Sequence, residues 1–229
     1  QNVKAYENCL NEILEELKLA QKEEAIPFCV VKLTGLLPFD ILEKLDANKT
    51  LTEKQQQAFI KGKERVRQIA LAAKTANTPF MIDAEESWIQ NTIDSIVFDL
   101  MLEFNTEKAL IYNTAQMYRH DRLKYIKNMF ALAQENKIHI GLKIVRGAYM
   151  EKERERAKNK GYASPIQVDK ASTDRDYNLA LQFCSDHHDT IAICCGTHNE
   201  ASSLLLTDLM KQKNISKENS YFYFAQLLG

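Results

Sequence analysis

The run IGLKIV at Ile140–Val145 is short and almost wholly apolar, and the charged and small residues of RGAY follow it at once. A continuous apolar run of this length is typical of a parallel strand that is buried on both faces. Five further runs share this character, at Cys29–Thr34, Phe80–Asp83, Ala109–Asn113, Thr190–Cys195 and Tyr221–Phe224. The pattern therefore predicts six parallel strands.

The segments between these runs have helical periodicity. Apolar residues recur at helical spacing after the second run, at Ile89, Ile93, Ile96, Val97 and Leu100. A later segment carries Thr173 and Asp176 at the spacing of a capping box, which predicts a helix start there. Three of the intervals between strand starts match the roughly 30 residues of a βαβ unit. The fold class is therefore expected to be α/β.

Two architectures fit this alternation, an open doubly wound sheet and a closed (β/α)8 barrel. No predicted strand is followed by the GxGxxG pattern of many dinucleotide-binding sheets. Polar residues instead cluster at the C-terminal end of nearly every strand, and a barrel gathers such strand ends at one rim. They are Lys32, Asp83, Glu85, Asn113, Gln116, Lys143, Arg146, Thr197 to Asn199, and Gln226. This distribution favours a TIM-type barrel.

Six strands are predicted where a barrel of this type typically has eight. Either the barrel is incomplete at the C-terminus of this chain, or the strand count is wrong. The first residues form an amphipathic stripe with Leu10, Ile13, Leu14 and Leu17, which predicts an extra helix packed on the barrel. The expected organisation is an N-terminal helical segment at 1–28 and a β/α barrel at 29–229.

Composition excludes several classes of function. The 229 residues include 30 basic and 31 acidic side chains, and a formal net charge of -1 argues against a nucleic-acid partner. No apolar stretch approaches the length of a membrane span, and the start lacks the apolar centre of a signal peptide. The five cysteines include no CxxC pair, so neither a disulfide framework nor a metal site is expected. We expect a reducing location: the cytoplasm or inner membrane surface of a bacterium, or a mitochondrion.

Lys32 interrupts the first apolar run, and a buried ammonium is costly unless it has a partner. Asp83, at the end of the next run, is the natural partner. One interpretation is a structural ion pair at the barrel rim. The other is a lysine that binds an anionic group of a substrate.

The segment KIVRGAY at Lys143–Tyr149 combines two cations, a glycine, an alanine and a tyrosine. Small residues let a planar ligand approach the backbone, and cations can bind phosphates or electron-rich ring atoms. A solvated loop is the alternative interpretation. The alternating charges at 151–158 that follow predict a solvated helix face.

His198 follows the fifth run and has no second histidine or cysteine at ligand spacing. With Thr197 and Asn199 it offers hydrogen-bonding groups suited to phosphate or ribose oxygens.

Six motifs in consistent order resemble the proline dehydrogenase family, in its monofunctional, eukaryote-like branch. They are VVKLTGL (30–36), IDAEES (82–87), IYNTAQMY (111–118), IVRGAYMEKERERA (144–157), THNE (197–200) and YFAQLLG (223–229). The resemblance implies a distorted (β/α)8 barrel that holds FAD. It also implies oxidation of L-proline to Δ1-pyrroline-5-carboxylate by hydride transfer to flavin N5, with electrons passed to a membrane quinone.

By this resemblance, Lys32 neutralises the substrate carboxylate, Asp83 organises the substrate side of the flavin, and Tyr149 packs on the proline ring. Lys143 approaches flavin N5. The remaining residues are expected around the cofactor, with Leu227 also beside the substrate. They are Asn113, Gln116, Val145, Arg146, Gly147, Ala148, Lys170, Thr173, Thr197, His198, Asn199, Gln226 and Leu227. The central prediction is that Lys32 and Lys143 converge over one flavin ring.

The family's final strands and its last helix, which bears an Arg-Arg pair and a Glu, have no counterpart in these 229 residues. We therefore expect the chain alone to bind proline poorly. Three alternatives stay open: a hydroxyproline dehydrogenase, a noncatalytic barrel remnant that acts as a binding module, and an aldolase-like barrel with a Schiff-base lysine at Lys32 or Lys143. Peripheral association with a membrane is also expected from the resemblance.

Overall fold

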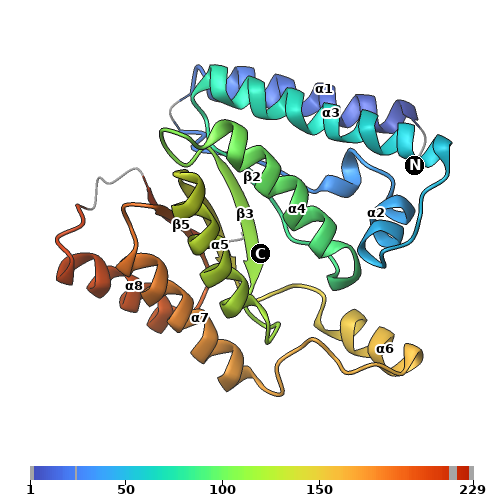
Figure 1. Ribbon diagram of the computed structural model, residues 1–229. Helices are drawn as coiled ribbons and strands as arrows, with labels where there is room; N and C mark the ends of the chain where they lie inside the picture. The colour runs from blue at the N-terminus through green and yellow to red at the C-terminus, as the bar shows by residue number, and fades with distance from the viewer. Residues whose placement is uncertain (1–2, 24, 217–220, 227–229) are drawn as a thin grey trace. The chain divides into compact units, whose positions relative to one another are not determined.

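The computed structural model describes residues 3–23, 25–216 and 221–226 (Figure 1). Contacts within the chain define two compact units, Gln1–Asn113 and Thr114–Gly229. The division falls inside one strand, β3 (Ile111–Gln116). Each unit is a series of parallel strands joined by helices.

The first unit contains α1 (Val3–Ala20), β1 (Cys29–Val31), the 3-10 helix η1 (Leu33–Gly35), α2 (Phe39–Asp46), α3 (Glu53–Ala76), β2 (Phe80–Ile82), α4 (Ser87–Phe104) and the start of β3. Strands β1, β2 and β3 pair in parallel, with Val31, Ile82 and Asn113 in one register row. The residues that follow β1 and β2 therefore emerge at the same edge. These residues are Lys32 and Asp83.

Helix α3 begins and ends where local chemistry dictates. Thr52 and Gln55 form a capping box that satisfies orphan amides of the first turn. Asn77 closes the helix in the left-handed conformation, with φ of 55°. Helix α1 packs along α3, and its buried stripe consists of Tyr6, Leu10, Ile13, Leu17 and Ala20. The predicted N-terminal helix is thus present, although Leu14 is only half-buried.

The second unit contains the end of β3, α5 (Arg122–Asn136), β4 (Ile140–Val145), α6 (Met150–Lys160), α7 (Lys170–Asp186), β5 (Ile191–Gly196), α8 (Glu200–Gln212) and β6 (Phe222–Ala225). Strands β4, β5 and β6 are parallel, with Ile144, Cys195 and Phe224 in one register row. Helices α7 and α8 pack on each other, and α7 packs on β4 and β5. Its buried face includes Tyr177, Ala180, Leu181 and Cys184.

Two sequence-based expectations about boundaries are wrong. Strand β3 extends to Gln116, three residues beyond the expected end at Asn113, so Asn113 and Gln116 both lie inside the strand. Their polarity resembles that of a turn, but both side chains are buried and hydrogen-bonded. Helix α7 begins at Lys170, because the Asp169 carboxylate caps it by accepting from Ser172 N at 2.7 Å. Thr173 and Asp176 are therefore buried residues within the helix.

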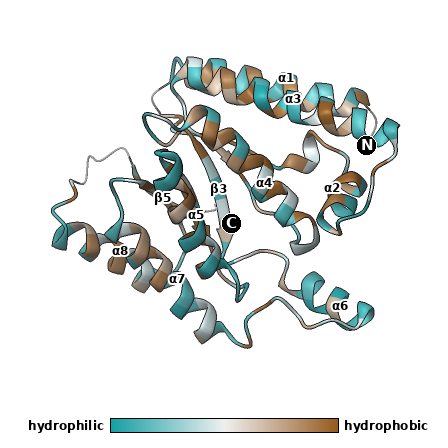
Figure 2. Ribbon diagram, viewed as in Figure 1, coloured by the Kyte–Doolittle hydropathy of each residue, from teal (hydrophilic) through white to brown (hydrophobic). Residues whose placement is uncertain are grey.

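Helix α6 has the solvated face that its charges predict, since Glu151, Lys152, Arg154, Glu155 and Lys158 are exposed, but one charged residue is an exception. Figure 2 colours most of α6 hydrophilic, in agreement with its charged sequence. Its Glu153, however, is fully buried, as is Ala157 one turn later. The i, i+4 spacing places both on the face that packs inward, and periodicity of charge alone does not reveal this face.

The described part of the chain supplies six parallel strands in the order β1-β2-β3-β4-β5-β6, with helices in the connections. Sequential parallel strands joined by helices are the connectivity of a (β/α)8 barrel. The predicted α/β class and strand count are therefore confirmed. None of the helices in the described part of the chain combines the length and the hydropathy that a membrane span requires.

Candidate active site

Lys32 and Asp83 occupy equivalent places in the first unit, each directly after a strand. Asp83 N donates to Val31 O at 2.8 Å, which continues the pairing of β1 with β2. The Lys32 side chain is exposed. Among the described residues it forms no ion pair with Asp83, in contrast to the structural interpretation of this lysine. Its positive charge is one of several influences on the pKa of the Glu85 carboxylate, of which burial is the largest.

Glu85 is a buried carboxylate that sequence reasoning did not single out as a partner of the first strand end. Its side chain accepts from Thr34 N at 3.1 Å and from Thr34 Oγ1 at 2.5 Å. Burial raises the pKa of Glu85, while the bonds from Thr34 and the charge of Lys32 oppose the rise. These bonds join the turn after Lys32 to the segment after Asp83.

A buried hydrogen-bond chain continues from Glu85 into α4 and β3. Glu85 N donates to Gln90 Oε1 at 2.8 Å, and Gln90 Nε2 donates to Asp94 Oδ1 at 2.8 Å. Asn113 Nδ2 donates to the same oxygen at 2.8 Å. Asn113 is fully buried, so its amide points into the fold rather than to a surface that a ligand could contact. The i, i+4 spacing of Gln90 and Asp94 is a signal that could have identified this chain.

Arg146 is the centre of a cluster of contacts in the second unit, called here the Arg146 hub, which consists of Arg146, Asp174, Tyr177, Thr197 and Ser202. Directly after β4, its guanidinium donates from Nε to Asp174 Oδ1 at 2.7 Å, from Nη1 to Thr197 Oγ1 at 2.7 Å and from Nη2 to Ser202 Oγ at 3.0 Å. The guanidinium also lies over the Tyr177 ring, 4.3 Å from its centroid. One cation thus ties the end of β4 to α7, to the segment after β5 and to α8.

The Tyr177 ring packs against one face of the Arg146 guanidinium. Its hydroxyl donates to Ile144 O at 3.2 Å and lies 3.3 Å from Cys195 Sγ. Burial raises the pKa of Tyr177, so the phenol is neutral at physiological pH. The sequence did not indicate that Asp174, Tyr177 and Ser202 contact Arg146, because these residues lie on helices rather than at strand ends.

Thr197 and Asn199 lie together directly before the first turn of α8. Thr197 Oγ1 accepts from Asn199 N at 3.0 Å, and Asn199 Oδ1 caps the helix by accepting from Ser202 N at 3.0 Å. His198 between them is exposed. Helix N-termini with such caps attract anions.

The residues predicted on α7 differ in their surroundings. Lys170 is exposed and donates to Asp174 Oδ2. Thr173 is buried, and its hydroxyl donates to Asp169 O at 3.3 Å. Lys170 is therefore available at the surface of the Arg146 hub, whereas Thr173 belongs to the helix interior.

The turn at Gly147 and Ala148 requires small residues. Gly147 has φ of +137°, and a Cβ there would lie 2.5 Å from the ring of Tyr118. Ala148 N donates to Gln116 Oε1 at 3.3 Å, which links the predicted Gln116 to this turn. Both Gly147 and Ala148 are exposed, so the backbone of the turn is accessible.

Lys143 and Val145 share one face of β4, because side chains alternate along a strand. Both are half-buried, as is Tyr149 at the start of α6. Ile144 faces the opposite side and is fully buried beside Tyr177. Gln226 follows β6 and is exposed, and Leu227 lies outside the described residues.

The residues of the second unit fit a ligand that bears phosphate groups. Arginine has five N–H donors, and Arg146 uses three of them in the described part of the chain. The exposed Lys170, the accessible turn at Gly147 and the N-terminus of α8 add donors or positive potential. This donor set suits the oxygens of a phosphate group.

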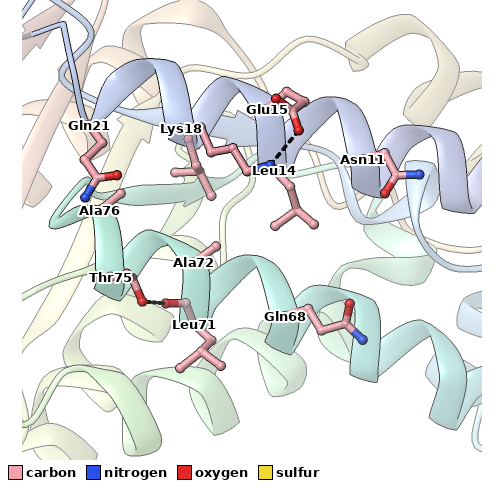
Figure 3. A pocket seen from close by; sticks show the side chains of 11 residues that line it. Asn11, Leu14, Glu15, Lys18, Gln21, Gln68, Leu71, Ala72, Thr75 and Ala76 are labelled. Carbon is pink, nitrogen blue, oxygen red and sulfur yellow. Dashed lines mark hydrogen bonds and ion pairs between the residues drawn. The ribbon is translucent and has the colours of Figure 1, made fainter.

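A separate surface pocket of about 500 Å³ lies between α1 and α3 (Figure 3). Leu14, Lys18, Gln68 and Leu71 are among its lining residues, and Lys18 forms an ion pair with Glu15 at 2.7 Å. None of the residues predicted to bind substrate or cofactor lines this pocket. It is therefore not the candidate active site.

Comparisons with known proteins agree with the motifs. The proline dehydrogenase family profile matches residues 1–229. Proline dehydrogenase 1, mitochondrial, of Drosophila melanogaster is 31% identical over 186 residues, which cover 77% of this chain and 27% of that protein. Hydroxyproline dehydrogenase of Xenopus laevis is 31% identical over 186 residues, which cover 78% of this chain and 39% of that protein. The chain thus spans less than half the length of these relatives.

Solved structures show the same fold. The crystal structure of proline utilization A from Bdellovibrio bacteriovorus, inactivated by N-propargylglycine, matches with a TM-score of 0.81 and 19% sequence identity. The match covers 98% of this chain and 24% of the other. At this identity the likeness concerns the fold, and the profile match over the whole chain decides the family. The chain belongs to the proline dehydrogenase family.

Proposed function

We propose that this chain is the FAD-binding part of a proline dehydrogenase that oxidises L-proline to Δ1-pyrroline-5-carboxylate. The match of the family profile to residues 1–229 carries this proposal. The Arg146 hub supports it, since its donors suit a cofactor diphosphate. The chemistry that FAD supplies when bound is the acceptance of a hydride at N5.

The residues of the second unit have cofactor roles in this proposal. Arg146, Thr197 and Asn199 bind phosphate or adenosine oxygens, with His198 and Lys170 at the exposed margin. The turn at Gly147 and Ala148, together with Val145, Gln116 and Gln226, lines the flavin. Lys143 provides positive charge beside the ring, which stabilises a reduced, anionic cofactor. Thr173 acts from inside the fold, as does Asn113 at the end of the first unit, because both are buried and hydrogen-bonded.

The substrate roles fall to Lys32, Asp83 and Tyr149, with Leu227 as a further contact. Lys32 presents an exposed ammonium to the proline carboxylate, and the ion pair orients the substrate. Asp83 organises the adjacent polar groups. Tyr149 offers an apolar ring face to the pyrrolidine. The predicted convergence of Lys32 and Lys143 on one ring stays a prediction.

Two measurements test this function. Purified protein is expected to carry the absorbance bands of oxidised flavin, and FAD is expected to be released on denaturation. Anaerobic addition of L-proline to a protein that contains the chain is then expected to bleach those bands. Colourless protein that does not take up added FAD would disprove the cofactor assignment. A flavin that proline does not reduce in the full protein would disprove the activity.

Hydroxyproline is the second candidate substrate, because the Xenopus hydroxyproline dehydrogenase is as similar in sequence as the Drosophila proline dehydrogenase. The ratio of kcat/KM for the two imino acids distinguishes the candidates. A ratio above one for proline supports the main proposal, and the reverse supports hydroxyproline.

The electron acceptor in this proposal is a membrane quinone, reached by peripheral association of the protein with a membrane. The mitochondrial name of the Drosophila relative supports a mitochondrial location in a eukaryotic source. A bacterial source implies the cytoplasmic side of the inner membrane. Quinone reduction by the full protein with proline as donor tests the acceptor.

A further inference from the structure

The arrangement around Asp174 assigns a role to a residue that the motifs do not mark. Asp174 lies in the first turns of α7, and its two carboxylate oxygens bind two different cations. Oδ1 accepts from Arg146 Nε at 2.7 Å, and Oδ2 accepts from Lys170 Nζ. A single carboxylate thus holds a guanidinium and an ammonium beside each other.

Contacts at all three nitrogens and on one face of the guanidinium fix the position of Arg146. Asp174 holds Nε, Thr197 holds Nη1, Ser202 holds Nη2, and the Tyr177 ring covers one face. Three of five N–H donors are used in these described contacts, so one N–H on each terminal nitrogen is left for a ligand. The Arg146 side chain is 21% exposed, which leaves an approach for that ligand.

The negative charge of Asp174 is unfavourable beside a site that binds an anion. A carboxylate reduces the positive potential of Arg146 and Lys170, and this weakens attraction of a diphosphate over distance. Its benefit is positional, because a fixed guanidinium fork binds phosphate oxygens with less loss of side-chain entropy. The two effects have opposite signs, so an experiment can separate them.

We propose that Asp174 is a positioning residue that orients Arg146 and Lys170 to bind the diphosphate of the dinucleotide cofactor. This inference rests on the proposed function. Asp174 does not touch the cofactor itself. Burial opposes its ionisation, but the hydrogen bonds and charges of Lys170 and Arg146 keep its pKa below the usual value, so the carboxylate is charged at neutral pH.

The test measures the affinity of the full chain for FAD and for riboflavin, which lacks phosphate, by quenching of flavin fluorescence. Asp174→Asn is expected to weaken FAD binding about tenfold, the loss of one charge-assisted hydrogen bond. Riboflavin affinity is expected to stay unchanged. Asp174→Glu keeps the charge and is expected to restore most of the FAD affinity.

Asp208→Asn is the matched control. Asp208 forms an exposed ion pair with Lys211 at 3.3 Å within α8, and it makes no described contact with Arg146. Its substitution removes the same charge and is expected to leave both affinities unchanged. If Asp174→Asn binds FAD as tightly as the unmodified chain, or more tightly, the positioning role is wrong.

The remaining outcomes are also decisive. Equal loss of FAD and riboflavin affinity in both Asp174 variants would indicate general disruption of the fold and contradict a positioning role. An unmodified chain that binds neither flavin would overturn the proposed function, and the inference with it.

Discussion

The Glu85 carboxylate accepts two hydrogen bonds from Thr34, one from the backbone amide at 3.1 Å and one from the hydroxyl at 2.5 Å. Thr34 follows β1 by three residues, and Glu85 follows β2 by the same number. This contact joins two neighbouring strand ends through a side chain that is 4% exposed. The turn that carries Lys32 is therefore held by the segment that carries Asp83.

Thr34→Val is expected to destabilise the protein by about 1–3 kcal/mol, because a buried carboxylate loses a donor. Urea unfolding measures the change in free energy. Thr75→Val is the matched control, since the exposed Thr75 bonds, within the described residues, only Leu71 O of its own helix through its hydroxyl. Equal effects of the two substitutions would show that the Glu85 contact contributes nothing special.

Asp94→Ala is expected to destabilise the first unit by about 1–3 kcal/mol. The substitution leaves the buried amides of Gln90 and Asn113 without their shared acceptor. Asp99→Ala on the same helix removes an exposed carboxylate and is expected to change stability by less than about 0.5 kcal/mol. Hydrogen exchange of the β3 amides checks the location of the effect, and unchanged exchange there would refute it.

Gly147→Ala is expected to destabilise the protein by at least about 2 kcal/mol. The alanine would combine a positive φ with a Cβ 2.5 Å from the Tyr118 ring. Gly161→Ala is a control for backbone strain alone, because Gly161 has φ of +71° and, apart from its chain neighbours, no atom of the described residues lies within 4 Å of the place its Cβ would take. Its expected cost is about 1 kcal/mol. Thermal melts of the two variants give the comparison, and similar melting temperatures would remove the steric argument.

The lowered pKa of Asp121 leads us to expect a loss of folding stability at low pH. Burial opposes its ionisation, but hydrogen bonds and charges from Arg122 and Arg119 hold the pKa of Asp121 well below its usual value. A lowered folded-state pKa stabilises the fold above the unfolded value near 3.8, and this stabilisation is lost as pH falls toward the folded value. Unfolding from pH 6 to pH 3 is expected to show a smaller decline in Asp121→Asn than in the unmodified protein. Parallel profiles would contradict the linkage.

Lys32→Met tests the proposed contact with the substrate carboxylate. In the full enzyme, KM for proline is expected to rise about tenfold or more, the loss of one charge-assisted interaction. The flavin spectrum is expected to stay unchanged. Lys49→Met removes an exposed lysine from a connection in the same unit and serves as control. An unaltered KM in Lys32→Met would exclude this lysine from substrate binding.

The order of apolar runs determined the fold class without tertiary information. Strands such as Ile140–Val145 are recognisable because both faces are buried, and this requires continuous apolar residues. The motifs around Lys143–Tyr149 and Thr197–Glu200 determined the family, because each follows a strand in a consistent order. The sequence alone therefore determined which strand ends carry polar groups.

Only the tertiary structure decided which polar groups bind one another. The sequence offers Asp83 as the natural partner of Lys32, but the two form no ion pair among the described residues, and Thr34 binds the buried carboxylate of Glu85. The sequence does not indicate that Asp174 binds Arg146, because the two are 28 residues apart and meet only through the packing of α7. Hydrogen bonds of this kind depend on distances of about 3 Å between distant segments, whereas apolar periodicity is a local property of the chain. For this reason the sequence by itself determined the strands and the family, and packing decided the partners of each charge.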